Sequence, residues 1–393
     1  MITNSTEQKQ NKLNLALNFI LYGVSVLFLY NRTVGSNLTT PLWGSWSYSE
    51  YLISYPNTFV RRGLFGEILL SLSKEGDVLI NLNIFLFTNF IIYMFLMMAF
   101  FLKMDMSLTS LTFLNISSFG ILNFTVFNLF YHRKEALFLN FFILFLILFV
   151  QKGIKKDLSL YSIFYLLIVT LFTALTHEGM LLIFSPFYFY IFKKHFNSSA
   201  LFSKFYVLIN FILFGMISII NVNKKLSNVV FDNLDIETQN IILSSLGGKG
   251  AIAALDWNLQ EVLIMFFKQI GSGQVFFWIY PFFLGFFTLY ILLYDSVDSL
   301  LQDINKLFSN RYLLIPFSVF ILGWDWGRWI IILILIIFLT ISLEVKPKLN
   351  ISRKPLIFLF IILSTFTVIP ECCLADDYLI FETIQYYFGL ITN

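Results

Sequence analysis

The chain has 393 residues, of which 58% are hydrophobic and only 12% are charged, and 49 of them are phenylalanine. No soluble globular protein could bury that much apolar surface, so we expect most of the chain to be surrounded by lipid. The net charge of +3, without a basic stripe, gives no indication of nucleic-acid binding, and the adjacent pair Cys372 and Cys373 excludes a disulfide framework.

The first apolar run covers about residues 13–30 and lacks the small-residue exit of a cleaved signal peptide, so we expect a retained first span. Further apolar runs lie near residues 79–102, 108–131, 136–151, 159–176, 179–193, 200–221, 274–294, 312–323, 329–343 and 355–370. A helix needs about 20 apolar residues to cross the hydrocarbon core, so flanking residues must extend the shorter runs. The sequence predicts an all-α polytopic membrane protein, a single membrane domain over residues 1–393 with about eleven transmembrane helices.

The distribution of lysine and arginine predicts the orientation of these spans. With the N-terminus in the cytoplasm, 15 of the 26 basic residues and 7 of the 23 acidic residues fall on the cytoplasmic side. The opposite side then carries most of the acidic residues, as the positive-inside rule requires. We therefore expect a cytoplasmic N-terminus and a C-terminus on the outer side.

Three longer segments lie on the outer side under this topology: 31–78, 222–273 and 371–393. The first contains a stretch from Phe59 to Leu70 with the pattern of an amphipathic helix, and the second contains a similar run over 259–270. Such helices lie in the membrane interface with their apolar face toward the acyl chains. We expect amphipathic interfacial helices on the outer face.

His177 and Glu178 stand between two predicted spans. Two ionisable groups at such a position are costly, so a partner or a function is expected. A histidine beside a carboxylate can act as a general base or donate to an anionic leaving group. The alternative is a helix-turn cap exposed to water.

Asp325, Trp326 and Arg328 lie between two other apolar runs. Aspartate and arginine three residues apart can pair on one helical turn, which would direct the guanidinium toward a phosphate, with Asp325 as a further candidate base. Trp326 could stack on a sugar ring. The alternative is an interfacial ion pair flanked by anchoring tryptophans.

Two further groups of charge favour phosphate binding. His132, Arg133 and Lys134 form a turn between spans on the side that should be poor in basic residues, so an orientation signal does not explain them. Arg61 and Arg62 open the amphipathic stretch of the first outer segment. For this arginine pair, contact with lipid headgroups is an equally good explanation.

No zinc-protease, serine-hydrolase or Walker motif occurs, and Gly247-Gly-Lys-Gly250 has no following Ser or Thr. We therefore expect no metal and no other cofactor. Arginine, lysine, histidine and carboxylate on the outer face fit chemistry on a lipid-linked diphosphate, whose departing charge arginine can stabilise.

In its length, its Phe-rich spans, its sizeable outer loop in the second half and its outer basic clusters such as Arg61-Arg62 and Arg328, the chain resembles the bacterial O-antigen and capsule-repeat polymerases (Wzy-type). These are glycosyltransferases of the inner membrane. The resemblance implies that oligosaccharide units of lipopolysaccharide or capsule, carried on undecaprenyl diphosphate, are joined at the periplasmic face without ATP or a nucleotide sugar. A chain-length regulator and a flippase would be its partners.

Three alternatives stay open. A glycosyltransferase of the wider GT-C class that uses a polyprenyl-phosphate sugar would carry a catalytic acid and an interface helix in its first outer loop, where this chain has Glu50 and Glu67. A lipid-linked oligosaccharide flippase would need charges along the middle of its spans, whereas these charges stop at the span ends. An acyltransferase would want a cytoplasmic histidine, and only His195 is available there.

Overall fold

The computed structural model describes residues 2–33, 45–56, 59–74, 77–117, 119–121, 133–151, 154–197, 200–219, 226–246, 248–257, 259–271, 275–294, 296–322 and 326–345. Within these ranges every regular element is a helix. The elements are α1 (Ile2–Thr33), α2 (Ser45–Tyr51), α3 (Gly63–Leu72), α4 (Val78–Lys103), α5 (Leu108–Ile116), α6 (Lys134–Phe149), α7 (Leu160–Thr176), α8 (Gly179–His195), α9 (Ala200–Ile219), α10 (Leu226–Asp232), α11 (Ile236–Leu246), η3 (Gly250–Asp256), α12 (Leu259–Gly271), α13 (Val275–Leu293), α14 (Val297–Phe308), η4 (Arg311–Ser318), α15 (Val319–Leu322) and α16 (Trp326–Ser342). The all-α class expected from the sequence is confirmed for these residues.

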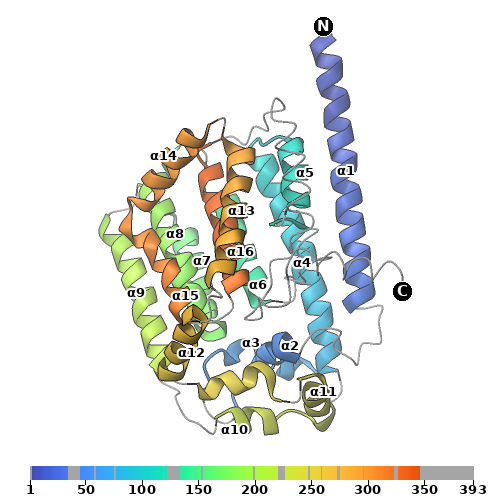
Figure 1. Ribbon diagram of the computed structural model, residues 1–393, viewed down its shortest axis with the longest axis vertical. Helices are drawn as coiled ribbons and strands as arrows, with labels where there is room; N and C mark the ends of the chain where they lie inside the picture. Colours follow the sequence, from blue (N-terminus) through green and yellow to red (C-terminus); the bar gives the residue numbers. More distant parts are fainter. Residues whose placement is uncertain are drawn as a thin grey trace.

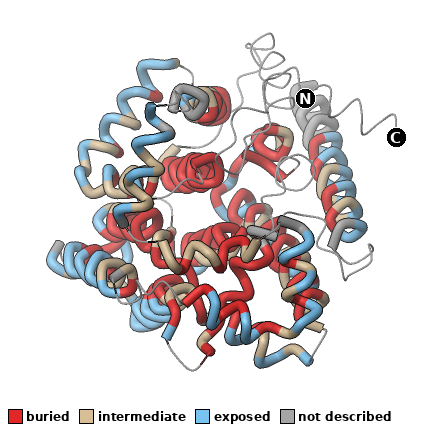
Figure 2. The backbone as a smooth tube through the Cα atoms, turned by 60° about the horizontal axis from the view of Figure 1, so that its bottom comes forward, coloured by how far each residue is buried: buried red, intermediate tan, exposed pale blue. Residues whose placement is uncertain are grey.

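The long helices form a bundle around α16 (Figure 1). Every residue of α16 is buried, as expected for a helix that is apolar on all sides. It packs against α13 and α6, and α4 packs against α6 while α8 packs against α9. Figure 2 shows buried backbone through the interior and exposed backbone along the outlying helices.

The outward faces of the bundle are apolar. Large hydrophobic side chains stand exposed on the outer helices, among them Phe19 on α1, Phe95 on α4, Phe164 on α7 and Phe205 on α9. Water would penalise such faces over this area, whereas lipid tails do not. The described helices are therefore those of a membrane-embedded protein.

By length and composition, three described helices can cross a membrane: Lys12–Asn31, Val78–Lys103 and Leu201–Ser218. Two bent helix pairs raise this number to five if each pair forms one span. The eleven spans expected from hydropathy are thus not shown. Several expected spans are apolar helices of 16 or 17 residues, namely α6, α7, α8 and α16, and the expected span at 355–370 lies outside the described residues.

Two expected spans differ in form from a continuous transmembrane helix. Over 108–131, the described part is the nine-residue α5, which is about 14 Å long and too short to cross the hydrocarbon core. Over 312–323, the chain forms the 3-10 helix η4, which contains Pro316, followed by the single turn α15. Proline removes a backbone donor and disfavours a continuous α-helix at this point.

The short helices of two outer segments gather at one end of the bundle. α2 and α3 come from the first segment, and α10, α11, η3 and α12 come from the second; all lie at the lower end in Figure 1. α12 is amphipathic, as its sequence predicts. Contacts join α2 to η3 and to α11, so the two segments form one layer across this end of the bundle.

Buried amide side chains connect α1 to α5. Asn18 donates to Thr112 Oγ1 at 2.9 Å and accepts from Asn115 Nδ2 at 3.0 Å. Asn14 adds a bond to Thr109 Oγ1 at 2.6 Å. Polar side chains of this kind hold helices together in lipid, where the hydrophobic effect contributes little between helices.

We expect Asn18→Leu to lower the stability of the folded protein by about 1–2 kcal/mol, because it removes the bonds to Thr112 and Asn115 without changing the side-chain volume much. The thermal unfolding midpoint in detergent measures this effect. Phe19→Leu is the matched control on the same helix, since Phe19 is 64% exposed and should leave the midpoint unchanged. Equal midpoints for both variants would show that the amides do not hold α1 in place.

Candidate active site

Charged side chains from four segments that are distant in the sequence meet in one buried cluster. Arg328 at the start of α16 places Nη1 3.0 Å from Glu135 Oε1 and 3.4 Å from Glu50 Oε2. His177 Nε2, between α7 and α8, lies 3.5 Å from Glu50 Oε1 and 3.8 Å from Glu135 Oε1. Arg133, before α6, lies 4.0 Å from Glu50 Oε2. All five residues are at most 3% exposed.

Glu50 is the carboxylate that contacts the most cations of the cluster. Burial alone would raise the pKa of Glu50, but the nearby Arg328, with His177 and Lys134, holds that pKa well below its usual range. Its Oε2 faces Arg328 and Arg133. Its Oε1 is buried and has no hydrogen-bond donor among the described residues, so it is available to a group that enters the cluster.

A second ion pair lies beside the first. The guanidinium of Arg62 donates from Nε and Nη2 to both oxygens of Glu178, at 3.1–3.2 Å. Burial raises the pKa of Glu178, but Arg62 and Arg61 outweigh it and lower that pKa to about 2. Because both carboxylate oxygens already accept from Arg62, Glu178 is less open to a new partner than Glu50.

His177 is neutral in this environment. Burial, together with the neighbouring Arg62, lowers the pKa of His177 to about 3. The imidazole ends α7 and packs edge-on against Phe138, with 6.5 Å between the ring centroids. A neutral imidazole directed at Glu50 can orient that carboxylate and can accept or donate a proton.

Lys134 completes the positive side of the cluster. Its side chain is fully buried, and Nζ lies 3.5 Å from the carbonyl oxygen of Thr176 and 5.4 Å from the centroid of the Tyr51 ring. An ammonium carries three donors, and the one bond to Thr176 is long. The remaining donors can serve an anion.

A close approach between the backbone of α3 and the chain that follows α2 brings Arg62 near Glu50. A Cβ at Gly66 would stand 2.0 Å from the carbonyl oxygen of Ile53, so only glycine lets α3 pack on the chain that leaves α2. Arg62 has φ 67°, in the left-handed region, which costs a non-glycine residue about 1–2 kcal/mol. The bidentate contact with Glu178 offsets part of this strain.

The second outer segment covers the cluster. Ser49 Oγ accepts from the backbone N–H of Ala251 at 2.8 Å, and Arg61 Nη2 donates to the carbonyl oxygen of Ala254 at 2.6 Å. These hydrogen bonds hold η3 against α2 and the chain that follows it. The cluster is therefore buried beneath this layer.

Among the described residues, the cluster holds more cations than carboxylates. Three carboxylates, Glu50, Glu135 and Glu178, face the four cations Arg62, Arg133, Lys134 and Arg328, and Arg61 adds a fifth at the edge. His177 contributes no charge near neutral pH. Arginine and lysine side chains gathered in this way can bind an anionic group such as a phosphate.

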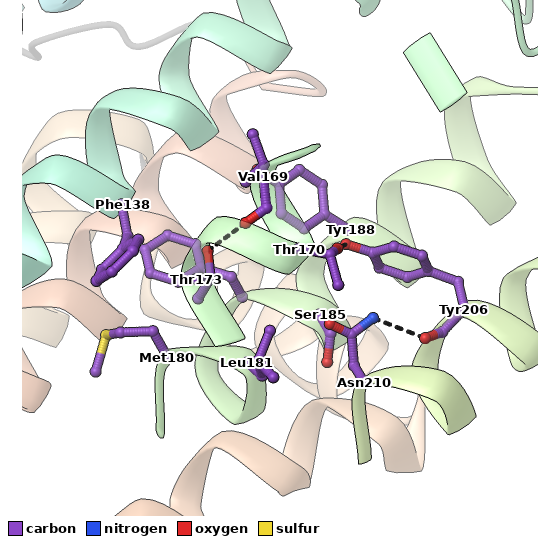
Figure 3. Close-up of a pocket in the computed structure, with 11 residues that line it drawn as sticks. Phe138, Val169, Thr170, Thr173, Met180, Leu181, Ser185, Tyr188, Tyr206 and Asn210 are labelled. Carbon is purple, nitrogen blue, oxygen red and sulfur yellow. Dashed lines mark hydrogen bonds between the residues drawn. The ribbon is translucent and has the colours of Figure 1, made fainter. Parts of the chain in front are cut away.

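A small cavity lies beside the cluster. It has a volume of about 10 Å³ and is lined by residues of α6, α7, α8 and α9, among them Phe138, Thr173 and Asn210 (Figure 3). Part of its polar lining is hydrogen-bonded, for example between Thr170 Oγ1 and Tyr206 OH at 3.0 Å, whereas Ser185 Oγ and Tyr188 OH are buried without a partner among the described residues. Such a volume holds about one water molecule.

Most residues singled out in the sequence belong to the cluster. Arg62, Arg133, Lys134, His177, Glu178 and Arg328 lie in it, and Arg61 lies at its edge. Trp326 instead packs among aromatic rings, 6.0 Å from Phe266 and 6.1 Å from Phe320 between centroids. His132 and Asp325 lie outside the described residues.

Two acids of the cluster, Glu50 and Glu135, were not among the site residues expected from the sequence. Glu50 is the one charged residue between Thr33 and Val60, and a lone carboxylate in an aromatic outer stretch is the signal that could have identified it. Glu135 directly follows Lys134, so its position in the same charged turn could have identified it as a site residue. Within the described part of the chain, no group of three or more His, Cys, Asp or Glu residues is placed to hold a metal ion.

Arg328→Leu leaves Glu50 and Glu135 facing each other without their shared cation, and we expect it to destabilise the protein by roughly 3 kcal/mol. Adding Glu135→Gln removes one of these carboxylates, so the double variant should be less destabilised than the sum of the two single changes. Thermal unfolding of the unchanged protein, the two single variants and the double variant gives the coupling free energy between Arg328 and Glu135. Lys194→Gln, which breaks a partly exposed pair with Glu344, should cost at most about 1 kcal/mol. If the destabilisations of the two single variants simply add in the double variant, the contact between Arg328 and Glu135 would be contradicted.

His177 predicts a pH-dependent stability. Its pKa falls from 6.5 to about 3 on folding, so between these values the unfolded chain binds one more proton at this residue than the folded chain. The contribution to stability is therefore lost as the pH falls, by roughly 1 kcal/mol between pH 7.5 and 5.5. Thermal unfolding should show a smaller loss over this interval in His177→Gln than in the unchanged protein. Identical pH dependence in both would mean that His177 titrates normally in the fold.

In comparisons with known proteins, no family model, no curated protein and no solved structure matches this chain at a significant level.

Proposed function

We propose that this chain is a membrane-embedded glycosyltransferase that takes its sugar from a polyprenyl-phosphate or polyprenyl-diphosphate carrier at the cluster. The observation that carries the proposal is the arrangement around Glu50. One of its oxygens faces Arg328 and Arg133, and the other is buried without a donor. Arginine and lysine beside this carboxylate can hold the departing phosphate, and the negative charge of a bound phosphate would raise the lowered pKa of Glu50 toward that of a base.

In the proposed step, a hydroxyl oxygen of the acceptor forms a bond to the anomeric carbon of the donor sugar. The hydroxyl proton passes to Glu50 Oε1. The bond between the anomeric carbon and the carrier phosphate breaks, and its electron pair leaves with the phosphate. Glu50 then returns the proton to the released phosphate or to water, so the carboxylate is regenerated without a metal or another co-reactant.

Arg133, Lys134 and Arg328 are the groups that we assign to the phosphate. Guanidinium groups bind phosphate oxygens through two parallel hydrogen bonds, and these bonds strengthen as charge develops on the leaving group. The layer formed by η3 and α2 would exclude water from the reacting centre. Exclusion of water strengthens these electrostatic interactions and prevents hydrolysis of the donor.

An apolar cavity next to the cluster supports a lipid carrier. It has a volume of about 380 Å³ and lies between α3, α4 and α7, lined mainly by Phe65, Leu69, Phe85 and Phe172. The first α3 residue that lines it is Phe65, three residues after Arg62. A polyprenyl chain could lie in this cavity while its phosphate reaches the arginines.

Two acceptors are compatible with this chemistry. The helical layout and outer basic residues favour the joining of oligosaccharide repeat units, as in the O-antigen and capsule polymerases, with a flippase and a chain-length regulator as partners. The position of Glu50 in the first outer segment, directly before the interfacial α3, favours the transfer of one sugar from a polyprenyl-phosphate donor, as in the GT-C class. We favour the second, because Glu50 lies at the centre of the cluster. In both cases we place the cluster on the periplasmic face of a bacterial inner membrane, with the lysine-rich end in the cytoplasm.

Glu50→Gln keeps the size of the side chain and removes its basicity, so we expect it to reduce transfer at least about 100-fold. Membranes from cells that carry only the variant should accumulate the polyprenyl-linked donor, detected by mass spectrometry of lipid extracts. Glu67→Gln is the matched control, since Glu67 is an exposed acid on the adjoining α3 and should leave transfer unchanged. Both variants must reach the membrane at normal abundance for the comparison to hold.

The glycan product distinguishes the two acceptors. Loss of a ladder of long chains in the Glu50 variant would identify a polymerase, and loss of a single sugar from an otherwise normal glycan would identify a single-sugar transferase. An unchanged profile of glycans and lipid-linked sugars in Glu50→Gln would refute the proposed function.

A further inference from the structure

A second cavity lies at the opposite end of the bundle from the charged cluster. It has a volume of about 480 Å³ and is lined by Lys155, Tyr190, Lys193, Lys194, Lys306, Ser309 and Asn310. These residues come from the chain before α7, from the last turn of α8, and from the end of α14 with the turn that follows it. Because α8 carries Glu178 at its start and Lys193 at its end, its 17 residues separate the two sites by about 25 Å.

The orientation of α14 indicates that this cavity lies at the level of lipid headgroups. α14 turns away from α13 by 112° and lies across the end of the bundle (Figure 1). It buries Leu300 and Leu307 and exposes its polar face. A strongly amphipathic helix perpendicular to its neighbouring span lies in the membrane interface, which places Lys306 among the headgroups.

The cavity has an excess of hydrogen-bond donors. Lys194 is already engaged, with an ion pair to Glu344 and a bond to Tyr190 OH at 3.1 Å. For Lys155, Lys193 and Lys306, no carboxylate of the described residues lies within ion-pair distance.

The described acids near this cavity have hydrogen-bond partners other than Lys155, Lys193 and Lys306. Asp303 accepts from Tyr294 and Asp157 accepts from Asn197. Asn310 adds an amide nitrogen that is buried and has no acceptor among the described residues. A cavity wall made of three such ammonium groups and an unsatisfied amide donor calls for an anionic oxygen ligand.

We propose that this cavity binds a phosphate group, either the headgroup of an acidic phospholipid or free phosphate. Basic pockets between helices at a membrane surface recognise headgroups in this way, and each ammonium group near an anionic surface adds to the attraction. Tyr190 and the aliphatic stems of the lysines provide the apolar border that a glycerol backbone needs. The site is separate from the charged cluster and does not depend on the function proposed for it.

The test uses the full-length protein in detergent with phosphatidylglycerol, with phosphatidylcholine, or with inorganic phosphate. Native mass spectrometry counts the bound lipids, and the thermal unfolding midpoint reports stabilisation. Lys193→Gln with Lys306→Gln removes two ammonium groups from the cavity. Lys12→Gln with Lys204→Gln removes the same charge from exposed positions that do not line it.

We expect phosphatidylglycerol, but not phosphatidylcholine, to remain bound to the unchanged protein and to the Lys12/Lys204 variant. In the Lys193/Lys306 variant, its affinity should fall at least tenfold. Stabilisation by inorganic phosphate that disappears in the same variant would support the site with free phosphate as its ligand. Equal binding of phosphatidylglycerol and phosphate in the two double variants would overturn the proposal. Because all four lysines are exposed, neither variant should impair folding.

Discussion

The structure depends on the cost of burying charge at one end of an apolar bundle. Glu50, Glu135, Arg328 and their neighbours are almost completely withdrawn from solvent, and each ion so placed loses several kcal/mol of hydration. Mutual contacts recover this free energy only if every partner is in position. The pair of Arg328 and Glu50 joins residues 278 positions apart, so the cluster forms only when the first outer segment and α16 are both in place.

This requirement explains the local geometry around the cluster. Gly66 allows α3 to touch the backbone at Ile53, and Arg62 adopts a left-handed conformation to reach Glu178. Neither feature improves the hydrophobic packing of the bundle. Both place charged groups from the first outer segment against the start of α8. Strain of this kind persists only where the surrounding structure fixes it, and it is most frequent at functional sites.

Hydropathy and charge could predict the residues of the cluster better than their arrangement. Charges at the ends of apolar runs are costly, and that cost alone identified Arg62, Lys134, His177 and Arg328. Glu50 was not among the predicted site residues, because its role depends on contacts with residues far away in the sequence. A hydropathy window does not contain such contacts. For the same reason, the sequence could not show that Glu178 pairs with Arg62 or that the ring of Trp326 packs against Phe266.

The number of spans was predicted less well for a different reason. Apolar composition marks burial, and it does not distinguish burial in lipid from burial in protein. α16 is apolar over its whole length because other helices surround it, so its 17 residues need not match the thickness of the bilayer. Over 311–322, Pro316 and the 3-10 geometry of η4 produce a shorter and irregular element from an equally apolar sequence.

The two ends of the bundle use different cations, and this difference fits their proposed ligands. Apart from Lys134, the cations of the buried cluster are arginines, among them Arg62, Arg133 and Arg328, whereas the basic residues that line the cavity at the other end are all lysines. Guanidinium is weakly hydrated and planar, so it tolerates burial and holds a phosphate in a fixed orientation for reaction. Ammonium is strongly hydrated and its contacts are not directional, so it suits a headgroup that exchanges with the surrounding membrane. A reacting phosphate must be held in one orientation, whereas a bound lipid headgroup need not be. This difference explains why arginine suits the proposed reaction site and lysine suits the proposed lipid site.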